Sequence, residues 1–144
     1  MKKIVAPDKA SRIWLSLGGV AWLLAMWLSS DASVAENATV TPLRSVDLSN
    51  DAGRELSMIT VTYPPGGSNP VHAHHAQALV YVLEGSIVMQ LRGAAPVTVA
   101  PGQTFYEGPD DVHIVSRNAS QSAPAKFLVF LVKEKGAPVL TPVN

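Results

Sequence analysis

The chain has 144 residues, 47% of them hydrophobic, with a formal net charge of zero at pH 7 and no cysteine. The lack of cysteine excludes disulfide bonds, cysteine-ligated zinc and thiol catalysis. Basic residues are scattered along the sequence and form no patch with interleaved aromatic residues, so we expect no nucleic-acid surface.

The start of the chain has the three-part pattern of a secretory signal peptide. Residues 1–12 are basic, residues 13–28 carry no charge, and Ser33 and Ala35 have the small-x-small spacing of a cleavage site. The apolar run is shorter than the ~20 residues that a membrane-spanning helix needs. We therefore expect cleavage of residues 1–35 and an exported protein, periplasmic or secreted, with no membrane contact afterwards. An uncleaved anchor is the alternative.

The rest of the chain is predicted to be all-β. Short segments rich in β-branched residues are separated by Gly and Pro, which is typical of a sandwich or small barrel. The predicted strands cover residues 55–63, 78–85, 86–93, 97–100, 112–118 and 125–133. Residues 36–54 are expected to form a linker and an N-terminal strand region, with 36–42 as the linker. Residues 134–144 are expected to form a tail or an edge strand, because Pro138 and Pro142 cannot donate to a central ladder.

One stretch, HAHHAQALVYVLEG at residues 72–85, contains three of the four histidines. Residues i and i+2 of a strand share a face, so His72 and His74 are predicted to project together. Imidazole is a common ligand of transition metals. Two histidines on the surface of a loop would give the same short pattern, so the pair alone does not decide between the two interpretations.

The surroundings of this pair resemble the first motif of the cupin family, G-x5-H-x-H-x3-E-x6-G. Gly66, His72, His74 and Gly85 fall on the motif positions. The acidic position is the exception, since it is occupied by Ala78.

The second cupin motif, G-x5-P-x-G-x2-H-x3-N, is matched less completely. Gly102 and His113 are in place, whereas Gly108 and Asp110 stand where proline and glycine are expected. Asn118 falls one residue late.

The resemblance covers roughly residues 55–133 and implies a double-stranded β-helix, the jelly-roll barrel of cupins. It also implies that His72, His74 and His113 are metal ligands. The ion would be a divalent transition metal, and the sequence does not choose among Fe, Mn, Ni, Zn and Cu. Without the motif, a core histidine bonded to the backbone would be the favoured interpretation of His113.

The fourth ligand position is open to question. Ala78 has the strand parity of His72 and His74 but cannot ligate, whereas Gln77 has the opposite parity and would need a bulge to reach the metal. Gln77 is therefore a doubtful fourth ligand. We expect water or substrate at this position, and we expect Ala78→Glu to raise metal affinity.

Two further residues are candidates for a catalytic role. His75 is expected to lie at the rim of the site, where it could transfer protons. Glu107 ends the segment TFYE, just before the turn GPDD. It is interpreted first as a solvated turn carboxylate and second as a base outside the metal's ligand shell. Asp110 and Asp111 are interpreted as turn formers.

Three functions are compatible with these residues. The resemblance implies a metal-dependent enzyme, such as a dioxygenase or isomerase, that acts on a small anionic molecule. A barrel that binds a metal or small ligand without turnover is the alternative, and a structural barrel with relic histidines is the third. The expected partner is a small-molecule ligand or substrate, and association of two copies into a homodimer is left open.

Overall fold

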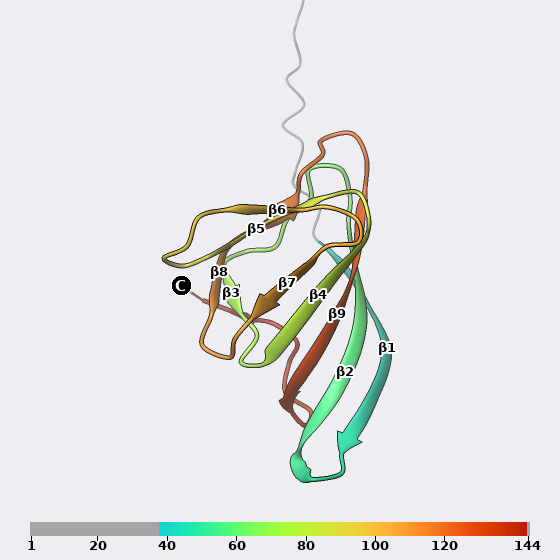
Figure 1. Cartoon of the computed structure of the whole chain (residues 1–144), viewed down its shortest axis with the longest axis vertical. Coiled ribbons are helices and arrows are strands. Elements are labelled where there is room, and N and C mark those ends of the chain that lie inside the picture. The colour runs from blue at the N-terminus through green and yellow to red at the C-terminus, as the bar shows by residue number, and fades with distance from the viewer. Residues whose placement is uncertain (1–37, 144) are drawn as a thin grey trace, which may run out of the picture. The chain divides into compact units, whose positions relative to one another are not determined.

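The computed structural model describes residues 38–143 (Figure 1); the predicted leader and the linker residues 36–37 lie outside the described residues. The described part forms ten β-strands and contains no helix, so no helix there is long and apolar enough to cross a membrane. The strands are β1 Thr39–Leu48, β2 Asp51–Tyr63, β3 His72–Ala73, β4 Gln77–Glu84, β5 Ile87–Leu91, β6 Val97–Val99, β7 Thr104–Glu107, β8 Val112–Asn118, β9 Ala125–Glu134 and β10 Thr141–Pro142.

The strands form two antiparallel sheets of five strands each. One has the order β1-β2-β9-β4-β7 and the other the order β10-β3-β8-β5-β6. Figure 1 shows β1, β2, β9, β4 and β7 side by side as one curved layer. The prediction of an all-β jelly-roll barrel is confirmed.

Alternating burial along the strands places the core between the sheets. In β4, Ala78, Val80 and Val82 are buried whereas the residues between them are exposed. β9 repeats this pattern, since every second residue from Ala125 to Lys133 is buried. A strand directs successive side chains to opposite faces, so apolar residues at every second position bury one face of the sheet. The core cluster consists of Ile59, Val61, Tyr63, Ala76, Ala78, Val80, Val82, Ile87, Met89, Val99, Ala125, Phe127, Val129 and Leu131.

The N-terminal strand starts earlier than expected. β1 pairs with β2 from Thr39 onward, so the interpretation of residues 36–42 as a linker is wrong from that residue. β2 likewise starts at Asp51, ahead of the predicted strand 55–63. The reason is that β1 is an edge strand and almost all of it is exposed. Its sequence therefore lacks the apolar alternation that marks a half-buried strand.

The C-terminal segment forms the edge strand that was predicted as one possibility. Thr141 pairs with Ala73 and Pro142 with His72, and the amide of Val143 donates to the carbonyl of Val71 at 3.0 Å. Because β10 is the outermost strand of its sheet, the missing N–H of Pro142 breaks no central ladder. Residues 141–143 are thereby held beside β3 and His72.

A bulge in β8 explains why Asn118 falls one residue late in the second motif. Gln90 of β5 pairs with Val115, but Leu91 pairs with His113, so Ile114 is an extra residue on β8. Such a bulge shifts the inward-facing parity by one residue. His113 and Asn118 are both buried as a result, although they are separated by an odd number of positions.

Candidate metal centre

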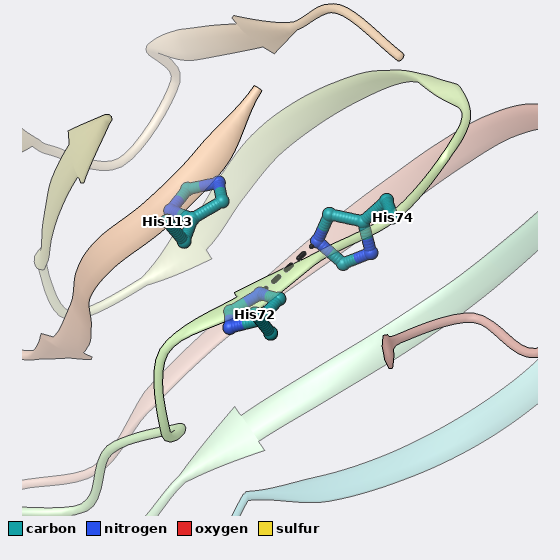
Figure 2. Close-up of side chains that lie close together, drawn as sticks. All are labelled: His72, His74 and His113. Atoms are coloured by element: carbon teal, nitrogen blue, oxygen red, sulfur yellow. Dashed lines mark hydrogen bonds between the residues drawn. The ribbon is translucent and has the colours of Figure 1, made fainter. Parts of the chain in front are cut away.

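Two of the three histidines are held face to face by neighbouring strands. His72 of β3 and His113 of β8 are direct partners in the antiparallel ladder. Their rings stack with centroids 5.0 Å apart and planes 7° apart, and each residue is only 1% exposed. His74 follows β3 directly, and Figure 2 shows the three side chains close together, with a dashed line joining His72 and His74.

Backbone carbonyls fix which ring nitrogen of two histidines carries the proton. Nδ1 of His72 lies 2.7 Å from the carbonyl oxygen of Pro70, and Nδ1 of His74 bonds to the carbonyl oxygen of Val139. A carbonyl only accepts, so each Nδ1 must donate. In the neutral ring this leaves Nε2 as a bare lone pair, which is the state that a metal ligand requires.

The Nε2 atoms of His72 and His74 cannot satisfy one another in neutral rings, because both Nδ1 atoms carry the proton and neither Nε2 has one to donate. The Nε2 atoms of His72 and His74 are 3.2 Å apart, and one ligand atom from each of the three histidines lies within 4.8 Å of the others. Two bare Nε2 lone pairs repel. In addition, neither ring nitrogen of the buried His113 has a hydrogen-bond partner. An unsatisfied buried polar atom costs about 1–3 kcal/mol, so this donor set fits a cation at its centre.

Burial keeps His72 ready to act as a ligand. Burial is the main reason that the pKa of His72 is lowered from its usual 6.5 to about 4, and the neighbouring His74 and His113 contribute to the same shift. The hydrogen bond to Pro70 and the charge of Glu107 act in the opposite direction but are outweighed. The ring is therefore neutral at pH 7.

The interpretation of Glu107 as a solvated turn carboxylate is wrong. The residue is only 2% exposed, and its Oε2 lies 2.7 Å from Nε2 of His113 and 3.3 Å from Nε2 of His74. It ends β7, where Ala78 of β4 is its direct partner. A carboxylate therefore lies beside two of the histidines, next to the motif position that Ala78 occupies and where water or substrate is expected.

The turn after β7 holds this carboxylate's backbone in place. The amide of Gly108 donates to Oδ2 of Asp111 at 2.7 Å, and the amide of Asp111 donates back to the carbonyl of Gly108 at 3.2 Å. Asp111 is thus the turn former that the sequence predicts.

Gln77 and His75 are not brought into the cluster. Gln77 is exposed, whereas its neighbour Ala78 is only 1% exposed and faces inward. Gln77, the doubtful fourth ligand, therefore points away from the cluster, as its strand parity predicts. His75 is exposed and has a φ of 49°, at the point where the chain leaves β3 and enters β4 in the other sheet.

A cavity of about 220 Å³ opens beside His72 and His74. Most of its walls are apolar, contributed by strands of both sheets and by the C-terminal segment. The lining residues are Val40, Ile59, Val61, Tyr63, Asn69, His72, His74, Met89, Ser116, Phe127, Val129, Val139 and Leu140. The cavity is the natural place for a small ligand next to the histidines.

Polar residues on one wall of this cavity form a directed hydrogen-bond chain that sequence reasoning missed. Asn69 Nδ2 donates to the Tyr63 hydroxyl at 3.0 Å, and Ser116 Oγ donates to the sulfur of Met89 at 3.3 Å. The 2.7 Å bond between the two hydroxyls must then be donated by Tyr63. Burial raises the pKa of Tyr63 to about 12, so the phenol stays protonated. Nothing in the sequence around Tyr63 marks it, because its partner Ser116 lies 53 residues further along the chain.

Comparisons with known proteins identify the family to which this fold belongs. Residues 59–131 match the cupin domain family. The rhicadhesin receptor of Pisum sativum is 34% identical over 73 residues, which are 47% of this chain and 34% of the receptor. This chain therefore aligns with only about a third of that relative.

Solved structures show the same fold. An oxalate oxidase in complex with the substrate analogue glycolate has a TM-score of 0.58 and 24% identity, covering 74% of this chain and 55% of that one. The DMSP lyase DddQ of Ruegeria pomeroyi has a TM-score of 0.53 and 22% identity, covering 61% and 43%. At these identities the likeness shows the fold alone. Together with the domain match over half of its length, the fold shows that the chain belongs to the cupin family.

Proposed function

We propose that this cupin binds one divalent transition-metal ion through His72, His74 and His113. The observation that carries the proposal is the convergence of one ring nitrogen from each histidine within 4.8 Å, with two Nδ1 protons committed to carbonyls. Imidazole donors suit Fe, Mn, Ni, Zn and Cu, with affinity following the general order for divalent ions.

We further propose that the site acts on a small anionic molecule, in the manner of an oxygenase or isomerase. When bound, the metal supplies a Lewis acid for an anionic oxygen. The cavity of about 220 Å³ lies below the ~300–1,000 Å³ of pockets for drug-sized ligands, so it suits a small molecule. The structurally similar oxalate oxidase was solved in complex with glycolate, which is a small anionic molecule.

Different residues of the chain would orient the ligands, hold a proton and exclude water at such a site. Hydrogen bonds to Pro70 and Val139 hold the rings of His72 and His74 with Nε2 toward the centre. Tyr63 stays neutral in the cavity wall, where it holds its proton on Ser116. The apolar remainder of the wall excludes water and strengthens the attraction between a charged ligand and the centre.

Metal analysis of the purified protein tests the proposal. We expect about one ion per chain in the wild type and a loss of most of it in His113→Ala, because a buried ligand is removed. His75→Ala is the matched control and should keep its metal, since His75 is exposed. Full metal content and affinity in His113→Ala would contradict the site. Turnover assays of the loaded protein with small carboxylates and diketones then separate an enzyme from a binding module.

Export is proposed on the sequence of residues 1–35, with its basic start, apolar run and small residues before Glu36. Intact mass of the protein from its native host should begin at Glu36, in the periplasmic or secreted fraction. A mass that retains residues 1–35 in a membrane fraction would show an anchored protein instead.

A further inference from the structure

We infer that Glu107 is a fourth protein ligand of this metal. The acid that the family's first motif places at position 78 is supplied here by the neighbouring strand β7. The inference rests on the proposed three-histidine site. It begins from the carboxylate Oε2, which lies 2.7 Å from Nε2 of His113 and 3.3 Å from Nε2 of His74.

Strand register explains how a glutamate on β7 can reach the space that a glutamate at position 78 of β4 would occupy. Ala78 and Glu107 are direct partners between β4 and β7, and both are buried, at 1% and 2% exposure. Direct partners in an antiparallel pair have Cβ atoms about 4.5–5.5 Å apart and project from the same face. A glutamate at either position therefore reaches the same space. The methyl group of Ala78 leaves that space free for the longer side chain of Glu107.

The geometry between Glu107 and His113 is that of two ligands, and it does not fit a hydrogen-bonded pair. Although 2.7 Å separates the carboxylate oxygen from Nε2, this nitrogen has no hydrogen-bond partner, because the ring does not aim its N–H direction at the oxygen. Atoms that approach closely without aiming at one another can aim at a common third point. A cation between the carboxylate oxygen and the Nε2 atoms of His74 and His113 satisfies these three atoms together. The oxygen lies outside the set of three histidine nitrogens that fall within 4.8 Å of one another, so binding together with His72 requires the Glu107 side chain to shift inward.

Charge compensation supports the same assignment. A buried carboxylate costs several kcal/mol unless it is paired. Within residues 38–143, the ion-pair partners of Glu107 are His74 and His113, and those two rings are needed in neutral form as ligands. A divalent ion supplies the missing positive charge. The fourth ligand then makes the centre less cationic by one unit than three histidines alone.

Metal affinity of Glu107→Gln tests the inference directly. Binding of Zn²⁺ and Mn²⁺ to metal-free protein, measured by competition with a chelator, should weaken at least tenfold, which corresponds to ~1.4 kcal/mol. Glu84→Gln is the matched control, because Glu84 is an exposed carboxylate of β4, and its affinity should stay at the wild-type value. The visible spectrum of the Co²⁺-loaded protein should also change in Glu107→Gln and stay unchanged in Glu84→Gln. Melting curves of the metal-free variants verify that each is folded.

A second experiment places the glutamate on β4, at the position given by the family's motif. The double variant Ala78→Glu with Glu107→Ala should bind metal more tightly than Glu107→Ala alone, because the carboxylate again enters the same space. Ala78→Glu alone should gain no affinity, since it forces a second carboxylate against Glu107; this reverses the expectation from sequence. A double variant that binds no better than Glu107→Ala counts against the inference.

The outcomes separate this inference from the proposed function. If Glu107→Gln keeps wild-type affinity and Co²⁺ spectrum while His113→Ala loses the metal, the three-histidine site stands and Glu107 is not a ligand. If His113→Ala also keeps its metal, the proposed site itself is wrong.

Discussion

Protonation of His72 links the site to the stability of the metal-free protein. The pKa of this ring is about 4 in the folded chain, against ~6.5 when it is exposed in the unfolded chain. Between these values the unfolded state binds a proton that the folded state does not. Stability therefore falls as the pH decreases from about 6.5 toward 4.

Urea unfolding of the chelator-treated protein across this pH range measures the effect. We expect the unfolding free energy to decrease with falling pH in the wild type, and the decrease to be smaller in His72→Gln, which has no ring to protonate. An identical pH slope in the two proteins would contradict the assignment. In the metal-loaded protein, protons compete with the ion for the same nitrogens, so metal affinity should weaken over the same range.

At the scale of the element, the end of β8 is fastened to two loops by one side chain. Nδ2 of Asn118 donates to the carbonyls of Pro64 and Ala123 at 2.9 and 2.8 Å, and its Oδ1 accepts from the amide of Ser120 at 2.9 Å. Asn118 is fully buried, so its amide group depends on these backbone groups for its hydrogen bonds. The bulge at Ile114 is what turns Asn118 inward to make these contacts.

Asn118→Ala should therefore destabilise the barrel markedly. It removes three hydrogen bonds made by a buried side chain to part-buried backbone groups, and each such bond contributes about 0.5–1.5 kcal/mol. We expect chemical denaturation to show a loss of about 2–4 kcal/mol. Gln77→Ala, at an exposed strand position, should change stability by less than about 0.5 kcal/mol. A loss of similar size in both variants would show that the hydrogen bonds of Asn118 matter little.

The C-terminal segment acts on the metal centre through its backbone. The carbonyl of Val139 accepts the Nδ1 proton of His74, and β10 holds the segment against β3. Partners of this kind orient a ligating ring, and their loss commonly costs 10–100-fold in metal affinity. Removal of residues 138–144 should weaken metal binding by about tenfold or more.

Val139→Ala is the control for this truncation, because it keeps the carbonyl that bonds to His74. Its metal affinity should stay close to that of the wild type in the same chelator competition. If the truncated chain binds metal as tightly as Val139→Ala, the tail does not orient His74.

At the scale of the whole molecule, the features that could be predicted from the sequence are those with a repeated or local pattern. Features that depend on which strands pair could not be predicted. Apolar alternation and turn residues predicted the strands and the barrel, and the motif spacing selected His72, His74 and His113. Glu107 was misjudged because its burial follows from its register with Ala78, which no local pattern encodes. The early start of β1 at Thr39 was missed for the same reason, since only pairing with β2 makes it a strand.

The inward orientation of Ala78 and the outward orientation of Gln77 agree with the parity predicted from the sequence. That prediction treats residues 72–78 as one continuous strand, whereas β3 and β4 are separate strands in different sheets, joined through His75. Ala78 faces inward because β4 alternates apolar residues at every second position. The apolar pattern of β4 alone was therefore sufficient evidence for the orientation of Gln77.

The proposed ligands also join the two sheets, and this predicts how the metal acts on the whole barrel. His72 and His113 lie on β3 and β8 of one sheet, whereas Glu107 lies on β7 of the other. An ion held by all of them binds only the folded barrel, because the unfolded chain does not keep these strands together. At a free metal concentration 100 times the dissociation constant, the stabilisation is about 2.7 kcal/mol. For a domain of this size that raises Tm by about 10 °C. Thermal melts with and without a chelator should show this difference in the wild type and in His75→Ala, and show none in His113→Ala. A Tm that does not respond to the metal in the wild type would mean that the ion does not link the sheets.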